Sequence, residues 1–350
     1  MRVLIIRRDN IGDLVCSTPM LSALRQKYPD AYIAMLVSSY NVEILNGNPD
    51  LDEVLVYIKR NQNRPDRGRF SLWFERIGLI LKIRRMKFDV IILANGGWRY
   101  ARKLGARKMI GFRDIFRSDR CQPDIIVPIS EPTELHEVEK MALLASAVGA
   151  DDAPGPLRLF PDEQICALLR HRLKHSGWKS ELSTVAIHIS QRSELQRWPE
   201  QNFVKLLCRL TELHPDIQFL LLWAPGSSDE AIYPGDDERA GAVRDAYKNR
   251  NLYPVPTSSV SELVAACSLC NYFVGSDGGA MHIAAGLGKP VLCFFGGVSN
   301  VSEWHPWHVP YRALTDETRL VSNIPVDAAI SKFNELFYES VAVGGQDTNA

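Results

Sequence analysis

A short glycine-containing segment near the C-terminus has the composition of a phosphate-binding turn. The apolar run that begins at Phe273 leads into Ser276-Asp277-Gly278-Gly279, and a helix is predicted directly afterwards, over residues 280–287. A strand that passes through glycines into a helix directs free backbone N–H groups and the positive end of the helix dipole at one point. Two glycines also allow a ligand to approach the backbone closely. The segment favours a bound phosphate or diphosphate; the alternative is a plain turn in which Asp277 caps the helix.

The end of the first predicted strand carries a second group of candidate residues. The strand expected at 2–6 continues into Arg7-Arg8-Asp9-Asn10-Ile11-Gly12-Asp13, which we interpret as a turn before a helix over 17–27. A carboxylate held on a rigid strand-to-helix turn is well placed to act as a general base, which makes Asp13 a candidate. Asp13 is equally suited to be the N-cap or a first-turn acid of its helix. Only Gly12 is present where a dinucleotide fingerprint needs three glycines, so no cofactor is expected.

The loop Ser190-Gln191-Arg192-Ser193-Glu194-Leu195-Gln196-Arg197-Trp198-Pro199 contains the third group. Arg192 and Arg197 could hold a phosphate through paired hydrogen bonds, or they could be incidental charges on a surface loop. His282, one turn into the predicted C-terminal helix, could donate to a phosphate or carry a proton, although a lone histidine is most often structural. The histidines and tryptophans at 304–308 show no metal-ligand spacing, so no metal is expected.

Strand and helix patterns alternate along the whole chain, which predicts parallel sheets covered by helices on both faces. The sequence 149–161 is rich in Pro, Gly and Asp and is the expected linker. We therefore predict two Rossmann-like domains facing across a cleft, at 1–155 and 156–340, with a frayed tail at 341–350. In such sheets ligands sit at the carboxyl ends of the strands, where all three groups of candidate residues fall.

Bulk composition describes an ordinary globular chain. Its 350 residues are 46% hydrophobic and 23% charged, and no apolar run approaches the length of a membrane span. The start of the chain lacks the apolar core of a signal peptide, and the seven cysteines lie mostly in apolar segments. These features favour a cytoplasmic protein. Cys267 and Cys270 form an isolated C-x-x-C, which we interpret as core packing.

The net charge of zero conceals an uneven distribution. Residues 59–120 carry 18 basic and 5 acidic side chains, which indicates an anionic partner for the N-terminal half. The same segment contains a cluster of large apolar residues between 70 and 86. That mixture suits contact with the inner face of the cytoplasmic membrane, but it is also typical of an amphipathic helix that covers a sheet. No nucleic-acid partner is expected.

Taken together, these motifs resemble the ADP-heptose:lipopolysaccharide heptosyltransferase family, glycosyltransferase family nine, over residues 1–335. The strongest likeness is in the two end motifs, residues 2–13 and residues 276–285. Weaker marks are the segments Asn48-Pro49-Asp50-Leu51-Asp52-Glu53-Val54, Ile110-Gly111-Phe112, His136-Glu137-Val138 and Arg197-Trp198-Pro199, and the pairs Thr18-Pro19, Leu24-Arg25, Lys289-Pro290 and Phe295-Gly296.

The resemblance implies an α/β protein with a GT-B fold and inverting transfer of a heptose or related sugar. The donor would be a nucleoside-diphosphate sugar such as ADP-heptose, and the acceptor an anionic glycolipid such as a lipopolysaccharide core. Asp13 would be the base. Donor contacts are expected from Asn10, Gly12, Ser190, Arg192, Gln196, Arg197, Asp277, Gly278, Gly279 and His282. Acceptor contacts are expected from Arg60, Arg64, Arg99, Arg117 and Arg120.

Two positions depart from the family pattern. Gln196 stands where the family often has a lysine that meets the donor phosphates, and Gly278 stands where a serine or threonine is usual. Arg and Lys are not interchangeable in phosphate binding, so the neighbouring Arg192 or Arg197 would replace that lysine only in part. Two other functions therefore stay open. One is a sugar-nucleotide-binding protein without catalysis, and the other is a sugar-nucleotide epimerase on the same scaffold.

Overall fold

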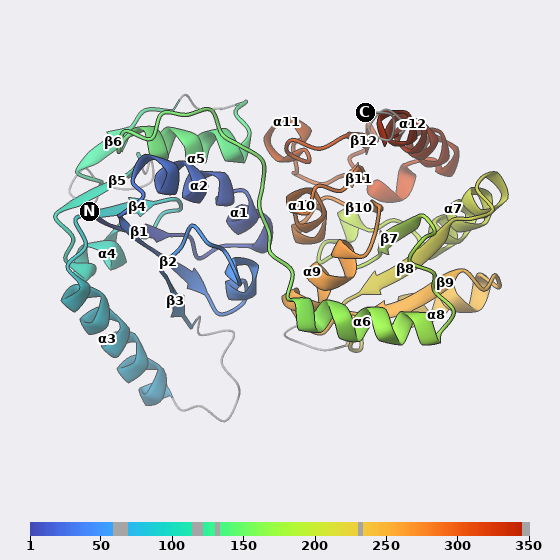
Figure 1. Ribbon diagram of the computed structural model, residues 1–350, viewed down its shortest axis with the longest axis horizontal. Coiled ribbons are helices and arrows are strands. Elements are labelled where there is room, and N and C mark those ends of the chain that lie inside the picture. The colour runs from blue at the N-terminus through green and yellow to red at the C-terminus, as the bar shows by residue number, and fades with distance from the viewer. Residues whose placement is uncertain (59–68, 114–121, 130–133, 230–233, 345–350) are drawn as a thin grey trace. The chain divides into compact units, whose positions relative to one another are not determined.

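The computed structural model describes residues 1–58, 69–113, 122–129, 134–229 and 234–344. The chain divides into two compact units, Met1–Arg158 and Leu159–Ala350 (Figure 1). The division falls inside the predicted linker, residues 149–161.

The first unit is built on a six-stranded parallel sheet in the order β3-β2-β1-β4-β5-β6. Its strands are β1 (Arg2–Ile6), β2 (Tyr32–Ser38), β3 (Glu53–Tyr57), β4 (Val90–Leu93), β5 (Lys108–Phe112) and β6 (Ile125–Val127). Its helices are α1 (Ile11–Val15), α2 (Thr18–Lys27), α3 (Arg69–Met86), α4 (Trp98–Ala101) and α5 (Glu137–Ser146), with 3₁₀ turns η1 (Val42–Leu45) and η3 (Arg102–Leu104).

The second unit has a six-stranded parallel sheet in the order β12-β11-β10-β7-β8-β9. Its strands are β7 (Thr184–His188), β8 (Gln218–Trp223), β9 (Leu252–Pro256), β10 (Tyr272–Ser276), β11 (Val291–Phe295) and β12 (Tyr311–Thr315). Its helices are α6 (Glu163–His175), α7 (Glu200–Leu213), α8 (Asp237–Ala246), α9 (Val260–Ser268), α10 (Gly279–Gly286), α11 (Val301–Trp304) and α12 (Val326–Gly344), with 3₁₀ turns η5 (Glu194–Gln196) and η6 (Val321–Asn323).

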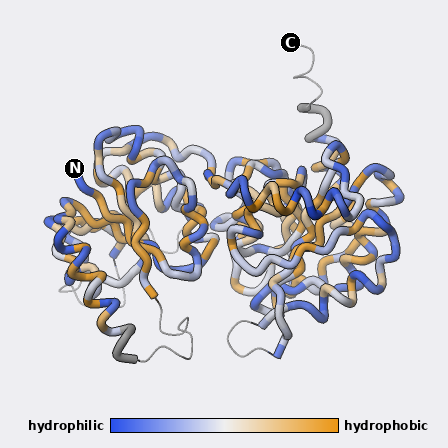
Figure 2. Tube along the Cα trace, turned by 60° about the horizontal axis from the view of Figure 1, so that its bottom comes forward, coloured by the Kyte–Doolittle hydropathy of each residue, from blue (hydrophilic) through white to orange (hydrophobic). Residues whose placement is uncertain are grey.

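Burial of the central strands explains why these sequences form parallel sheets. In β1, Leu4 pairs with Ala34 of β2 on one side and with Ile91 of β4 on the other, and all three are fully buried. Strands covered on both faces need nearly continuous apolar residues, which is the pattern of β11 throughout and of β1 and β8 after their first residue. Figure 2 shows the hydrophobic residues along the strands inside each unit and hydrophilic ones on the outer helices.

Both units share one topology. Counted within each unit, the strand order is 3-2-1-4-5-6, which is the order of the dinucleotide-binding Rossmann fold. The strand order reverses between the parallel neighbours β1 and β4 in the first unit and between β7 and β10 in the second, and ligands bind at such switch points. The predicted pair of Rossmann-like α/β domains is confirmed.

The structure differs from the sequence prediction at several element ends. Of residues 10–13, predicted as a turn, Asn10 is the N-cap and 11–13 form the start of helix α1. Strand β12 was not predicted, because its residues are half-buried and lack a continuous apolar run. Helix α5 begins at Glu137 instead of residue 134, because His136 caps it: the Val138 N–H donates to His136 Nδ1, 3.1 Å away. Helix α12 continues to Gly344, so residues 341–344 of the predicted tail are helical, and 345–350 lie outside the described residues.

Candidate active site

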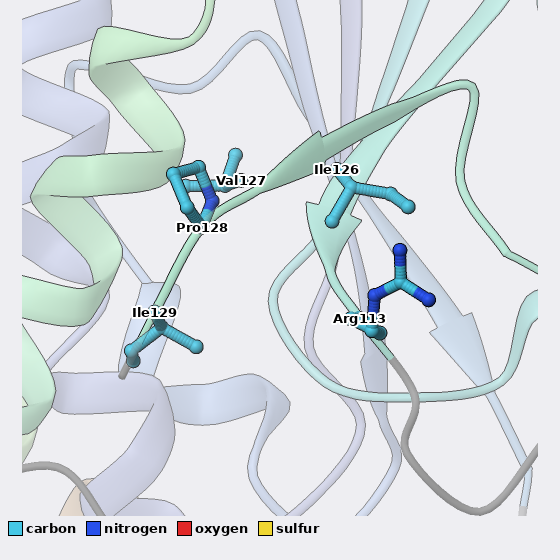
Figure 3. Close-up of a pocket in the computed structure, with 5 residues that line it drawn as sticks. All are labelled: Arg113, Ile126, Val127, Pro128 and Ile129. Atoms are coloured by element: carbon cyan, nitrogen blue, oxygen red, sulfur yellow. The ribbon is translucent and has the colours of Figure 1, made fainter. Parts of the chain in front are cut away.

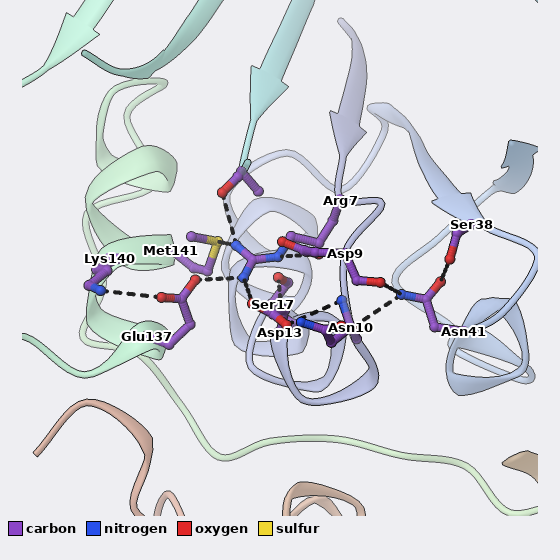
Figure 4. Close-up of polar contacts among 11 residues, drawn as sticks. Arg7, Asp9, Asn10, Asp13, Ser17, Ser38, Asn41, Glu137, Lys140 and Met141 are labelled. Atoms are coloured by element: carbon purple, nitrogen blue, oxygen red, sulfur yellow. Dashed lines mark hydrogen bonds and ion pairs between the residues drawn. The ribbon is translucent and has the colours of Figure 1, made fainter. Parts of the chain in front are cut away.

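A buried arginine organises the carboxyl end of β1. Arg7 is 2% exposed and contacts three carboxylates (Figure 4): Asp9 at 3.0 Å through Nε, and Asp13 at 2.8 Å and Glu137 at 2.7 Å through Nη2. Its Nη1 donates to the carbonyl of Ala94, just after β4. Arg7 therefore joins the ends of β1 and β4 to helices α1 and α5.

The charges of this Arg7 cluster are closely balanced. Burial lowers the pKa of Arg7, but the charges of Asp9, Glu137 and Asp13 outweigh that effect, so the guanidinium stays protonated. Lys140 contributes a second cation, 3.5 Å from Glu137. Burial raises the pKa of Asp9 from 3.8 to about 6, although Arg7 acts in the opposite direction. Asp9 Oδ1 is buried and accepts no hydrogen bond within the described part of the chain.

Asp13 is held in place by two hydrogen bonds, one to each oxygen of its carboxylate. It is the third residue of α1, and its Oδ2 accepts from the backbone N–H of Asn10 at 3.2 Å, while Oδ1 accepts from Arg7. It is thus a first-turn acid of its helix, as one of the two interpretations of the sequence held. Its side chain is 15% exposed, so a hydroxyl group can still reach the carboxylate. A carboxylate fixed at both oxygens in this way is pre-oriented for proton transfer.

The predicted residues beside Asp13 support the same loop. The Asn10 carbonyl accepts from Asn41 Nδ2 at 3.2 Å, and Ser38 Oγ donates to Asn41 Oδ1 at 2.9 Å (Figure 4). Gly12 is buried in the first turn of α1. These contacts tie the loop after β1 to the end of β2, so the loop is held from both sides of the strand.

The glycine turn of the second unit has an unusual backbone. Gly278 has φ +154° and ψ −173° and is the N-cap of α10, so the alternative in which Asp277 caps this helix is wrong. This backbone region is accessible essentially only to glycine. Gly278 therefore permits a conformation that a serine or threonine would not adopt without strain.

Asp277 is the polar centre of this turn. Its Oδ2 accepts from Ser299 Oγ, and Gln196 Nε2 lies 3.5 Å from the same oxygen. His282 Nε2 is 3.9 Å from Oδ1, and the His282 ring packs edge-on against Trp304. Both Asp277 and His282 are buried, and Gly279 begins α10 beside them. The structure therefore brings Asp277, Gly278, Gly279, His282 and Gln196 together.

The loop after β7 docks on this turn through a residue that sequence reasoning missed. Gln191 Nε2 donates to the carbonyls of Ser276 and Asp277 at 3.2 and 3.1 Å. Ser190 Oγ accepts from the N–H of Ala224, after β8. Gln191 had no recognisable signal beyond its position between two predicted site residues.

The two predicted phosphate-binding arginines differ in their surroundings. Arg197 Nε donates to the carbonyl of Gln191 at 2.9 Å, and its Nη1 lies 3.3 Å from the buried carboxylate of Asp236. Its guanidinium therefore braces the loop, with Glu194 as a further carboxylate contact at 3.2 Å. Arg192 is exposed to solvent.

Of the predicted acceptor residues, the structure describes Arg99, which is exposed on α4. The other four, Arg60, Arg64, Arg117 and Arg120, lie outside the described residues. A pocket of about 430 Å³ is lined by Arg113, Ile126, Val127, Pro128 and Ile129 (Figure 3). It lies at β5 and the edge strand β6 and contains none of the predicted site residues.

The described residues contain neither a cluster of metal ligands nor a membrane-spanning helix. No group of three or more His, Cys, Asp or Glu side chains there is arranged to hold a metal ion. No helix in that part of the chain combines the length and apolar character needed to cross a membrane.

Comparisons with known proteins identify the family. Residues 76–322 match the family model of glycosyltransferase family 9 (heptosyltransferase). Lipopolysaccharide heptosyltransferase 3 of Escherichia coli K12 is 26% identical over 303 residues, which cover 85% of this chain and 82% of that protein. A glycosyltransferase family 9 structure from Veillonella parvula superposes with a TM-score of 0.83 at 18% identity, covering 97% of both chains.

The E. coli heptosyltransferase WaaC, solved with ADP-2-deoxy-2-fluoro heptose, superposes with a TM-score of 0.73 at 17% identity, over 96% of this chain and 99% of that one. These structures confirm the predicted GT-B type of fold, with two Rossmann-like units. The family match covers well over half of the sequence. The chain therefore belongs to glycosyltransferase family 9, the heptosyltransferases.

Proposed function

We propose that this enzyme transfers a heptose from ADP-heptose to a lipopolysaccharide core or a related anionic glycolipid, with inversion at the anomeric carbon. The relatives are lipopolysaccharide heptosyltransferases, and one related structure holds an ADP-heptose analogue. The observation that carries the proposal is the Asp13 carboxylate, fixed by Arg7 and by the Asn10 N–H at the switch point of the first unit.

The proposed reaction is a single displacement. Asp13 accepts the proton of an acceptor hydroxyl while the hydroxyl oxygen forms a bond to the anomeric carbon of the donor. The bond from that carbon to the diphosphate oxygen breaks, and ADP leaves with the electron pair. Asp13 Oδ1 accepts from the buried Arg7, whereas Oδ2 accepts from the exposed Asn10 N–H and has a second lone pair, so Oδ2 is the oxygen proposed to receive the proton.

The second unit is proposed to hold the donor. The N-terminus of α10, with its glycines at the first positions, offers backbone N–H groups and the positive end of a helix dipole to the diphosphate. His282 and Gln196 would add side-chain donors, and Arg192 would add positive charge. Asp277 accepts from Ser299 and thereby fixes the turn that carries these groups.

The first unit is proposed to receive the acceptor at the membrane surface. Helix α3 packs Ile83 into the core but leaves Trp73 58% and Phe74 64% exposed, with the basic Arg84 and Arg85 in its last turn. Exposed aromatic side chains are typical of helices that lie on membranes, and Arg84 and Arg85, about three turns further along α3, would add attraction to anionic lipids. Acceptor binding by Arg99, and by Arg60, Arg64, Arg117 and Arg120, belongs to the same proposal.

The proposal is tested by Asp13→Asn, with the exposed Asp30→Asn as a control of equal charge change. Loss of a general base lowers kcat by about 100- to 10,000-fold. We expect that loss in Asp13→Asn, with ADP affinity and circular dichroism unchanged and with normal activity in Asp30→Asn. Full activity of Asp13→Asn would disprove the role of Asp13 as base.

A thermal-shift panel of nucleotides and nucleotide sugars tests the donor, because a ligand that binds the folded state raises the melting temperature. We expect ADP and ADP-sugars to give the largest shifts; a larger shift with UDP or GDP compounds would overturn the proposed donor. Tight donor binding without transfer to any glycolipid would favour a binding protein.

NMR of the product tests inversion, which retention of the anomeric configuration would refute.

A further inference from the structure

A second arginine at the switch point of the first unit has surroundings unlike those of Arg7. The Arg8 guanidinium carbon lies 4.7 Å from the ring centroid of Tyr57 and 4.6 Å from that of Tyr100. Gly97, with φ +112°, borders it closely: a Cβ at that position would lie 2.8 Å from Arg8 Nη2. The aromatic rings and the glycine together shape a place for one guanidinium.

No acid neutralises this guanidinium directly. Among the described residues Arg8 makes no ion pair and no hydrogen bond, and its Nε is buried. The nearby carboxylate of Asp9 contacts Arg7 instead. Burial lowers the pKa of Arg8, although Tyr57, Tyr100 and the nearby charge of Asp9 act in the opposite direction, and the second guanidinium of Arg76 adds to the lowering. A half-buried cation that no carboxylate contacts directly is unfavourable in the free protein, and a bound anion would stabilise it.

Two further groups point to the same ligand chemistry. Arg76 of α3 lies 4.9 Å from the ring centroid of Tyr57, so two guanidinium groups share one ring. The Tyr100 hydroxyl is buried and has no hydrogen-bond partner in the described part of the chain. Burial raises the pKa of Tyr100 to about 12, so its O–H remains available as a donor. Two cations and one hydroxyl donor suit a phosphate or a carboxylate group.

We propose that Arg8, Arg76 and Tyr100 form an anion subsite that binds a phosphate or carboxylate group of the acceptor. Tyr57 keeps both guanidinium groups in place through its ring. The subsite lies at the carboxyl ends of β1 and β3 and at α4, and Arg8 precedes Asp13 by five residues. An acceptor anchored here by its charge would present a neighbouring hydroxyl to the loop that carries Asp13. This assignment to the acceptor rests on the proposed function, but the anion subsite does not.

The first test uses inorganic phosphate alone, with the full-length protein. We expect phosphate at millimolar concentration to raise the melting temperature of the wild type and to have less than half that effect on Arg8→Gln. The control is Arg107→Gln, which removes the same charge from a side chain that is 84% exposed. It should respond to phosphate as the wild type does. Equal phosphate shifts in Arg8→Gln and wild type would overturn the subsite.

The second test measures transfer to a phosphorylated lipopolysaccharide core and to the same core after phosphatase treatment. For the intact core we expect Arg8→Gln to raise the acceptor KM at least tenfold, with ADP affinity unchanged and kcat within about twofold. An unchanged acceptor KM in a variant that has lost phosphate binding would assign the subsite to free phosphate and refute the acceptor role. Phosphatase treatment identifies the anchored group: the effect of Arg8→Gln disappears if it is a phosphate and persists if it is a carboxylate.

The two tests separate this proposal from the proposed function. If the wild type transfers no sugar to any core, the phosphate-binding test still decides whether the anion subsite exists. If the wild type is active and Arg8→Gln has an unchanged acceptor KM, the acceptor subsite fails while the proposed function stands. Arg8→Gln should fold normally, because the cation that it removes makes no ion pair and no hydrogen bond among the described residues, and its contacts are with the rings of Tyr57 and Tyr100. An unfolded variant would contradict that reasoning, and Arg8→Lys would then be compared in its place.

Discussion

Asp9 is the member of the Arg7 cluster whose charge destabilises the folded state. Its pKa of about 6, against an ordinary 3.8, means that ionised Asp9 costs the fold up to about 3 kcal/mol relative to the unfolded chain. The cause is burial, which Arg7 at 3.0 Å offsets only in part. The change Asp9→Asn removes the charge and keeps the size of the side chain. We therefore expect Asp9→Asn to stabilise the first unit at neutral pH.

The sign of the pH dependence follows from the raised pKa. A carboxyl with a raised pKa in the folded state favours folding while it is protonated, and this contribution is lost as the pH rises from about 4 through about 6. The wild type therefore carries the full cost above about pH 6, whereas asparagine never carries it. The gain of Asp9→Asn should be near zero at about pH 4 and reach up to about 3 kcal/mol at about pH 7.5.

Hydrogen exchange of the β1 amides measures this gain, because β1 lies in the compact unit that contains Asp9 and exchange reports the opening of the structure around each amide. Exchange free energies would be compared at several pH values after correction for the intrinsic rates. Asp30→Asn, on an exposed turn, is the matched control and should change little at any pH. If Asp9→Asn gains nothing at about pH 7.5, or gains equally at every pH, the attribution of the raised pKa to burial is refuted.

Three further predictions concern the other positions. Gly278→Ala should lower the free energy of unfolding by about 1–3 kcal/mol and weaken ADP binding in calorimetry, because φ +154° strains any side chain. The control is Gly241→Ala in α8, where a Cβ meets nothing within 4 Å and the free energy of unfolding should not fall. Arg7→Met should lower the unfolding free energy measured by urea denaturation by about 3–5 kcal/mol, since it leaves buried carboxylates uncompensated; a loss under 1 kcal/mol would contradict this. Replacing Trp73 and Phe74 by serine should reduce sedimentation with anionic vesicles without changing the melting temperature, and unchanged sedimentation would refute membrane contact by α3.

Much of the fold could be predicted from local sequence because its strands are buried on both faces. Long apolar runs such as those of β1 and β8 can be recognised as buried strands from the sequence alone. Their alternation with helices indicates parallel sheets. Strand β12 escaped prediction for the opposite reason: only part of each side chain is buried, so its sequence has no strong pattern. The start of α1 was missed because a capping contact between Asn10 and Asp13 is weak evidence until the backbone is known.

The candidate site was predictable only where its residues are close in sequence. Asp277, Gly278, Gly279 and His282 form one short motif and meet in space. Glu137, by contrast, lies 130 residues from Arg7, and no local pattern links them. Its one signal was the segment His136-Glu137-Val138, which resembles the family but carries no geometric information.

The two units show how one topology can support different chemistry. At the switch point of the first unit, strand β1 ends in the buried Arg7, which collects Asp9, Asp13 and Glu137, so this unit contributes titratable groups. At the equivalent point of the second unit, β10 ends in a glycine turn held by Gln191, so this unit contributes backbone N–H groups with little side-chain charge. A transfer reaction needs both a proton acceptor and a stabilised anionic leaving group. Because the strand order is the same in both units, this difference in chemistry comes from the side chains of the loops and not from the topology.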